Sequence, residues 1–249
     1  LTGKDCGLEE RAPMCGVPYH AVEGYLSRLV QKGYKVAIAE QMEDPKQAKG
    51  LVKREVIRVV TPGTLTNSQV LEESKNNYLM GIVYIDGVFG VSTVDVSTGD
   101  YLVTEGRNER SLLDEIYKFS PSELICNEAF YMSGIDLEDL KVRLNAVISA
   151  LENRFFSDDS CRRILREHFH VEHLEALGLA DYETGAIAAG AVLQYLYETQ
   201  KNTLEHLTRL TVYTTGQFMM LDTSTRRNLE LTETLREKQK RGTLLWVLD

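Results

Sequence analysis

Cysteine is scarce in this 249-residue sequence, and its four copies lie far apart. No two of them form the CxxC spacing that commonly holds zinc, and they are too few for the dense disulfide framework of small secreted proteins. We therefore expect reduced thiols that bind no metal. The four positions are Cys6, Cys15, Cys126 and Cys161.

Signals for membranes and for nucleotide hydrolysis are also absent. No charged-then-apolar leader opens the sequence, and the longest apolar run, around 185–193, is too short to span a bilayer. We therefore expect a cytoplasmic protein without membrane contacts. The sequence starts at Leu1 rather than at an initiator methionine, which indicates a piece of a longer chain. No phosphate-binding P-loop motif occurs, so this polypeptide is not expected to hydrolyse ATP.

The net charge of −9 at pH 7 is distributed unevenly. Residues 1–65 contain 10 lysines and arginines against 8 aspartates and glutamates, whereas the remainder carries a balance of −11. Only this front segment is suited electrostatically to a phosphate backbone. Its cations cluster near glycine and proline breaks, although a solvated loop is the alternative explanation. They are Lys46, Lys49, Lys53, Arg54 and Arg58.

The front segment has the pattern of a helix followed by two strands. Pro18 suits a first helical turn and Gly33 a stop, which predicts a helix from about 19 to 32. The short apolar run at 36–39 predicts a covered strand, and the run at 56–60 predicts a second strand. The apolar stripe of the helix consists of Val22, Tyr25, Leu26, Leu29 and Val30.

The second of these strands should end in the turn Thr61-Pro62-Gly63-Thr64. Proline fixes its own φ, biases Thr61 towards extended geometry and leaves Gly63 free to take the positive φ of a type II turn. Residues 65–76 then form a polar, weakly patterned stretch, which indicates a linker between domains.

The longer part after this linker has the pattern of an α/β layer with a mixed sheet. Its first two strands are joined by Asp86-Gly87, a strong hairpin signal, and alternating helices and strands follow. The expected strands are Tyr78–Ile85, Val88–Val96, Tyr101–Thr104, Glu123–Cys126 and Val142–Val147, and the expected helices cover 110–119, 158–169 and 183–199.

Two features stand out towards the end of the chain. The helix at 183–199 is apolar nearly all round and contains Gly185 and Gly190, small residues that would let another backbone approach closely. Strands at 210–213 and 218–221 then precede a helix for which Asp222 or Thr223 is the expected cap. Beyond it, we expect an apolar face at Leu244–Leu248 that is left without cover.

Several stretches together resemble the bacterial MutS family of DNA mismatch-repair proteins. No single stretch is a catalytic signature, but their shared order covers the whole chain, whose length suits two or three domains. They are Met14–Leu26, Glu40–Gln41, Asp44–Pro45, Lys49–Gly50, Val59–Thr64, Asp95–Gly99, Leu193–Tyr195, Thr199–Gln200, Met220–Asp222 and Thr225–Glu230.

The resemblance implies an α/β chain divided into parts of one larger protein. Residues 1–65 would be the second half of a mixed-sheet mismatch-recognition domain, and residues 66–76 a linker. Residues 77–201 would form a connector domain with a ribonuclease H-like fold. Residues 202–249 would begin a mainly helical core, or lever, domain.

The resemblance also implies a function. The full-length protein would bind mismatched duplex DNA as a homodimer and signal to MutL through an ATP-dependent clamp, with ATP and Mg bound by a domain absent here. The family's wedge phenylalanine and its companion glutamate lie upstream of Leu1, which puts autonomous mismatch recognition in doubt. This piece would supply DNA-backbone support, linkage and docking, without catalytic residues, cofactor or metal. The implied DNA contacts are Lys4, Met14, Gln41, Lys49 and Lys53, and the implied docking residues are Arg162 and Arg163. Ion pairs with Asp158 or Glu167 are the alternative use of these arginines.

An enzymatic alternative follows from the same resemblance, because a ribonuclease H-like sheet could carry a metal-dependent nucleic-acid hydrolase. Such an enzyme needs converging carboxylates around two Mg²⁺ ions, but the strand at 78–85 contains no acid. Asp86 lies in a turn, and Asp95 and Asp100 flank the next turn and could equally stabilise it. A metal site at His168, His170 and His173 is a further alternative, although their spacing does not give one helical face.

Overall fold

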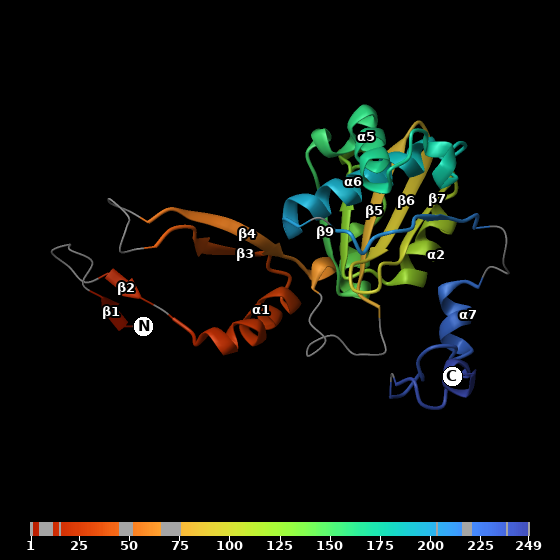
Figure 1. Cartoon of the computed structure of the whole chain (residues 1–249). Coiled ribbons are helices and arrows are strands. Elements are labelled where there is room, and N and C mark those ends of the chain that lie inside the picture. Colours follow the sequence, from red (N-terminus) through yellow and green to blue (C-terminus); the bar gives the residue numbers. More distant parts are fainter. Residues whose placement is uncertain are drawn as a thin grey trace.

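The computed structural model describes residues 2–4, 12–14, 16–44, 52–65, 76–202, 204–215, 221–237 and 239–248. Two parts can be distinguished: a projecting arm, formed by the described residues of 16–65, and a body, formed by the described residues of 76–215 (Figure 1). Helices and mixed sheet pairing occur together, which confirms the α/β class.

The body is built on a six-stranded mixed sheet with the order β10-β7-β6-β5-β8-β9. Strands β5, β6 and β7 form an antiparallel meander, whereas β8 and β9 run parallel to β5 on its other side. This is the strand arrangement of a ribonuclease H-like fold, with β10 added parallel to β7. The bounds are β5 (Tyr78–Ile85), β6 (Val88–Asp95), β7 (Tyr101–Gly106), β8 (Glu123–Cys126), β9 (Val147–Ala150) and β10 (Thr211–Val212).

Turn chemistry fixes the register of the meander. Asp86 and Gly87 have φ values of 48° and 79°, the two positive angles of a type I′ turn, so the predicted hairpin is confirmed. At the other end of β6, the Asp95 carboxylate accepts hydrogen bonds from the N–H groups of Ser97 at 2.8 Å and Thr98 at 3.3 Å. This side chain therefore holds the turn that leads to β7.

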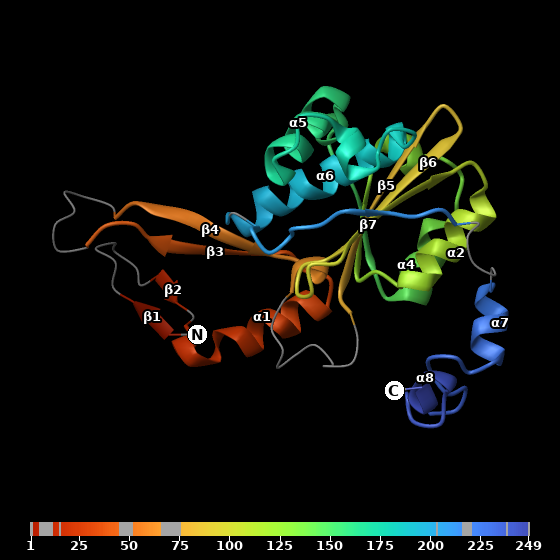
Figure 2. The same ribbon diagram turned by 45° about the vertical axis from the view of Figure 1, so that its right-hand side comes forward.

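Helices cover both faces of the sheet (Figure 2). The side chains of β5 alternate between two cores: Leu79 packs on the side of α5 and α6, and Met80 and Ile82 pack on the side of α2, α3 and α4. The body is thus a three-layer α/β/α structure. The helix bounds are α2 (Glu109–Phe119), α3 (Glu128–Tyr131), α4 (Leu137–Leu144), α5 (Asp158–Phe169) and α6 (Glu183–Gln200), with short 3-10 turns η3 (Asn153–Phe156) and η4 (Leu174–Leu177).

Small residues allow α6 to lie close to its neighbours, as the sequence predicted. A Cβ atom at Gly190 would lie 2.3 Å from the Cβ of Cys161 in α5, and one at Gly81 in β5 would lie 2.4 Å from Val192 of α6. Cys126 and Cys161 are buried free thiols, and burial raises the pKa of each to about 12. Both are therefore structural rather than reactive.

The arm consists of a helix beside a two-stranded ribbon that points away from the body (Figure 1). Helix α1 (Val22–Gln31) follows the 3-10 turn η1 (Tyr19–Ala21) and ends before Gly33, whose φ is 84°, which confirms the predicted helix and its stop. Strands β3 (Val36–Gln41) and β4 (Arg54–Val60) pair antiparallel. A separate antiparallel pair is formed by β1 (Thr2–Lys4) and β2 (Ala12–Met14).

Burial in the arm differs from the prediction. A small apolar cluster of Val30, Val60 and Leu65 occupies the base of the arm, next to the body. Tyr25 and Leu29 of the predicted stripe are 48% and 43% exposed, and β3 is mostly exposed. The prediction of a covered strand was wrong, because the described ribbon has only two strands and too little covering surface to bury both faces.

The turn after β4 also differs from the prediction. Pro62–Thr64 forms a 3-10 turn, η2, and Gly63 does not take a positive φ, so the predicted type II turn is wrong. The Thr61 N–H donates to Oγ1 of Thr64 at 3.0 Å, which closes the turn on itself. Gly63 is required for space instead, because a Cβ there would lie 2.9 Å from the Cβ of Leu79.

The strand predicted at 142–147 was placed too early. Asp136 caps α4 by accepting the N–H of Asp139 at 2.9 Å, and the helix continues until Asn145, whose φ of 51° ends it. Val142 is therefore helical and 81% exposed, and the strand begins only at Val147.

Beyond the sheet, the described chain contains α7 (Thr223–Asn228) and α8 (Leu244–Leu248). Asp222 accepts the N–H of Thr225 at 2.7 Å, which confirms the predicted cap. The predicted strand at 210–213 is reduced to β10, whereas the linker at 66–75 and most of the strand at 218–221 lie outside the described residues. The α8 side chains are 39 to 75% exposed, as expected for an uncovered apolar face. No helix in the described ranges is both long and apolar enough to cross a membrane.

Candidate nucleic-acid interface

The far end of the arm brings two of the predicted DNA contacts together. Gln41 is the last residue of β3 and pairs with Arg54, and the neighbouring Met42 N–H donates to the carbonyl of Lys53 at 2.9 Å. All four side chains are exposed. Gln41 and Lys53 therefore share one accessible end of the ribbon. The predicted contacts whose side chains lie outside the described part of the chain are Lys4, Met14 and Lys49.

Lys53, which directly precedes β4, has an acidic partner on that strand. Its Nζ lies 2.6 Å from Oε1 of Glu55. This hydrogen bond raises the pKa of Lys53 and lowers that of Glu55, so both groups are charged at neutral pH. A DNA phosphate would have to compete with Glu55 for this ammonium group, which reduces the attraction that the cation can offer.

Strand β4 itself carries two cations, which lie in different places and have different roles. Arg54 is exposed at the far end, in line with Lys53. Arg58 lies nearer the base, and its Nη2 donates to the carbonyl of Thr64 in η2 at 3.4 Å. The far end of β4 is thus suited to a ligand, whereas Arg58 contributes to the arm's own turn.

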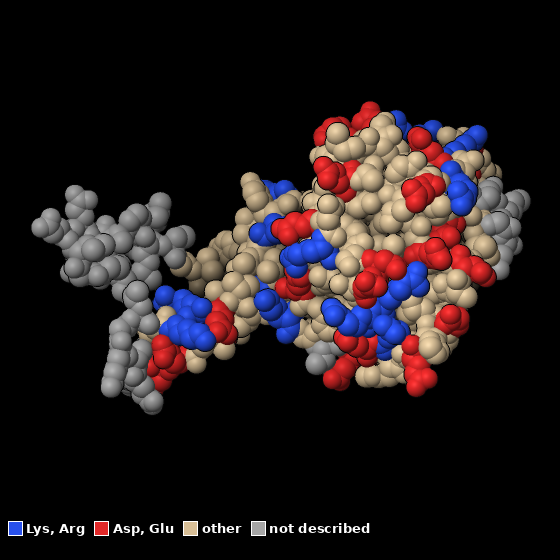
Figure 3. Space-filling model, turned by 90° about the horizontal axis from the view of Figure 1, so that it is seen from above, with Lys and Arg blue, Asp and Glu red and all other residues tan. Residues whose placement is uncertain are grey.

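The arm also exposes large apolar side chains. Tyr34 is 60% exposed, Met42 52% and Val56 41%. On the face shown in Figure 3, basic and acidic side chains are interspersed over the coloured parts of the arm and the body. The exposed cations Lys53 and Arg54 at the arm's far end are the described groups best placed beside Gln41 for contact with a phosphate backbone.

The two arginines predicted to dock a partner lie on α5 and each faces an acid one turn away. Nε of Arg162 is 2.6 Å from Oδ1 of Asp158, and Nε of Arg163 is 4.0 Å from Oε1 of Glu167. These are the ion pairs considered as the alternative from the sequence. Pairs of this exposed kind contribute little to stability, so they leave the arginines available to a competing carboxylate.

A buried charged group joins the arm to the body, and it was missed by the sequence analysis. Glu123, at the start of β8, has no exposed side-chain surface. Its Oε1 lies 3.0 Å from Nζ of Lys35 and accepts the hydroxyl of Tyr195 at 2.7 Å, while its Oε2 accepts the N–H of Gly63 at 3.2 Å. Burial, followed by the Glu123 charge, raises the pKa of Tyr195, so the phenol keeps the proton that it donates. We call these four residues the joint.

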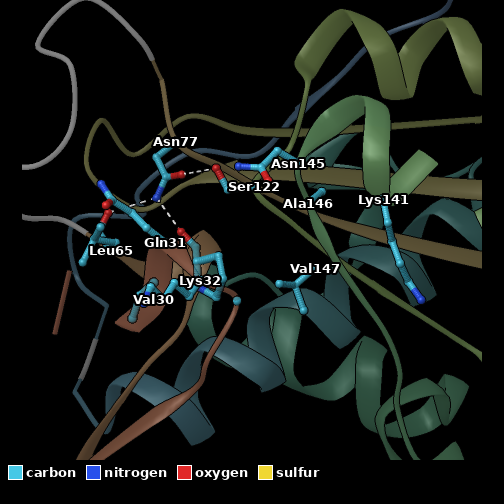
Figure 4. Close-up of a pocket in the computed structure, with 12 residues that line it drawn as sticks. Val30, Gln31, Lys32, Leu65, Asn77, Ser122, Lys141, Asn145, Ala146 and Val147 are labelled. Carbon is cyan, nitrogen blue, oxygen red and sulfur yellow. Dashed lines mark hydrogen bonds between the residues drawn. The ribbon is translucent and has the colours of Figure 1, made fainter. Parts of the chain in front are cut away.

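Beside the joint lies an open cleft of about 400 Å³ between the end of α1, η2 and the start of β9 (Figure 4). Asn77 crosses it: its Nδ2 donates to the carbonyls of Pro62 at 2.9 Å and Leu65 at 3.1 Å, and its Oδ1 accepts the Ser122 hydroxyl at 2.5 Å. The polar side chains that point into this cleft thus hold the turn η2 onto the body.

The carboxylates considered for a nuclease have structural partners. Asp95 is fully buried, and in addition to the turn after β6 it accepts the N–H of Asn77 at 2.9 Å. Asp86 occupies the positive-φ turn between β5 and β6. Within the described ranges, no three His, Cys, Asp or Glu side chains are grouped so that they could hold a metal ion.

His168 of the predicted histidine group also has structural partners. Its Nε2 lies 2.8 Å from the carbonyl of Leu207, so this nitrogen donates, and its Nδ1 accepts the hydroxyl of Tyr197 at 2.7 Å. Burial lowers the pKa of His168, in keeping with a neutral ring that ties α5 to α6 and to the segment before β10.

Comparison with known proteins matches two consecutive domains. Residues 1–69, which contain the arm, match the family model of MutS domain I, and residues 77–208, which contain β5 to β9, match that of MutS domain II. These matches define a protein with the first two domains of a DNA mismatch-repair architecture. The chain belongs to the MutS family.

Its relatives are similar over the whole length of the chain. It is 62% identical to the DNA mismatch repair protein MutS of Lachnoclostridium phytofermentans, 51% to that of Acetivibrio thermocellus and 49% to that of Ruminiclostridium cellulolyticum. The chain spans 27%, 29% and 28% of these proteins, respectively.

Proposed function

We propose that this chain supports duplex DNA in a mismatch-repair protein and relays the position of the DNA to the rest of that protein. The observation that carries the proposal is the arm itself, a ribbon that projects from the body and exposes Gln41, Lys53 and Arg54 at its far end. Amide and cationic side chains are the usual donors to phosphate oxygens. We also propose Lys4, Met14 and Lys49 as DNA contacts, because the family resemblance implies them.

The body has a different proposed role. It links the arm to later domains and offers Arg162 and Arg163 to MutL, whose carboxylates would displace the ion-pair partners on α5.

We propose the domain division 1–65, 66–76, 77–201 and 202–249. We also propose that the ATPase, its Mg and the homodimer contacts belong to other parts of the full-length protein, a proposal supported by the match of this chain to MutS domains I and II. We propose no cofactor for this chain. Because its proposed ligand is DNA, we propose a cytoplasmic location.

A salt titration of DNA binding tests the first role. The chain is mixed with a fluorescent duplex that contains a mismatch, and the association constant is measured over a range of salt concentrations. Each neutralised phosphate adds about −0.9 to the slope of log K against log salt, so contacts from the arm's far end predict a slope of about −2 to −3. A slope near zero would contradict the proposal.

A further inference from the structure

Lys35 attaches the arm to the body through a side-chain ion pair, away from the place where the chain itself passes from one to the other. Residues 61–65 are the last described residues of the arm before the chain continues to the body, and there the Gly63 N–H binds Glu123. Lys35 lies just before β3, on the other side of the ribbon's base, and its ammonium group reaches the same carboxylate at 3.0 Å. We propose that Lys35 is a positioning residue that sets the angle between the arm and the body.

Two attachments at the base are needed to fix a ribbon. Val36 and Val60 are partners in the β3–β4 ladder, so Lys35 and η2 lie at the same end of the arm but on different strands. Strand β4 is held by η2 and by Gln200 of α6, whose Nε2 donates to the carbonyl of Val59 at 3.5 Å. Without Lys35, β3 would lack this ion pair to the body, and the ribbon could turn about its β4 side. With Lys35 also bound to the body, both strands are held, and the far end of the arm keeps one direction.

The surroundings of Lys35 give it a fixed position at the body's surface. Its Nζ also donates to the hydroxyl of Tyr195 at 3.0 Å and lies 5.2 Å from the centre of that ring. The Lys35 side chain is 35% exposed, whereas the Glu123 side chain is fully buried. Lys35 is thus the accessible member of the joint, and its removal leaves the contacts of Gly63 and Tyr195 with Glu123 in place.

The body contains a group of the same chemistry that does not involve the arm. Glu115, which is buried, accepts the hydroxyl of Tyr213 at 2.6 Å and lies 3.1 Å from Nζ of Lys118. Lys118 and Glu115 are both on α2, so this group cannot orient the arm. It provides a matched control for the loss of a lysine from a Lys–Glu–Tyr group.

Pulsed EPR distance measurement on the 249-residue chain tests the proposal. Spin labels are placed at E40C on the arm and D159C on α5, two exposed sites, with Cys6 and Cys15 replaced by serine and the buried Cys126 and Cys161 kept. We expect one narrow distance distribution in the parent chain and in K118M. In K35M we expect a distribution about twice as wide, as for a ribbon that turns about a hinge.

A second variant keeps the test decisive if K35M fails to fold because Glu123 is left buried without its cation. K35M/E123Q removes both charges and keeps the size of the Glu123 side chain, so the body should remain folded by circular dichroism while the arm distribution stays wide. K35R should retain the narrow distribution. A narrow distribution in folded K35M or K35M/E123Q would overturn the proposal, whether or not the chain binds DNA.

Discussion

The arm and the body place similar residues in opposite surroundings. Helix α6 of the body is buried along nearly its whole length, whereas α1 of the arm buries only Leu26, Ser27 and Val30. Strand β5 is covered on both faces, but β3 is mostly exposed. The body is therefore stable through its own packing, while the arm depends on its base and on the joint for its position and leaves its far end free for a ligand.

A pair of glycine substitutions should give the largest difference between these two regions. A methyl group at Gly190 would collide with Cys161, including its backbone, so we expect G190A to lower the free energy of unfolding by about 3 kcal/mol. A methyl group at Gly24 would meet no described atom within 4 Å beyond the adjoining backbone of α1, so G24A should stabilise the helix by up to about 1 kcal/mol. Urea denaturation of both variants measures this contrast. Equal effects would show that the arm is packed as tightly as the body.

The stability of the body should vary with pH because of His168. Because burial lowers its pKa in the folded state, the unfolded chain binds the proton more readily. The contribution of the neutral His168 ring to the free energy of unfolding is complete above pH 6.5, the ordinary pKa of histidine. It is lost as the pH falls through the lowered pKa of the folded state. We expect the melting temperature to fall between pH 7 and pH 5, and to fall less in H168F. H173N, which alters an exposed histidine outside this helix, serves as the control, and an unchanged pH profile in H168F would contradict the assignment.

The smallest predicted effect concerns the far end of the arm. E55Q removes the carboxylate that competes for Lys53, so DNA affinity should rise by about twofold and the salt slope should become steeper. K53Q should have the opposite effect. Fluorescence anisotropy measures both, with D158N on α5 as a control that should leave DNA affinity unchanged. A loss of affinity in E55Q would show that Glu55 orients the lysine rather than competing for it.

Local signals allowed much of the body to be predicted from the sequence. Asp86-Gly87 specified a hairpin, Asp222 a helix cap, and the strand Glu123–Cys126 was predicted with its observed bounds. The strand near 147 was misplaced because Val142 suggested a strand, whereas the caps of α4 extend the helix past it.

The joint could not be predicted, because its members are far apart in the sequence. Lys35 and Tyr195 are separated by 160 positions, and Tyr195 and Glu123 by 72. A glutamate at the start of a strand has no local sign of burial. Gly63 was noticed, but for a turn that needs positive φ, whereas its role is to let the backbone of the arm approach Leu79 and Glu123.

Amide hydrogen exchange with and without a mismatched duplex tests the difference between arm and body most directly. The account predicts slower exchange on DNA binding at residues 39–44 and 52–56, the far end of the ribbon, and unchanged exchange in α5. Protection confined to α5, with the ribbon unaffected, would contradict it.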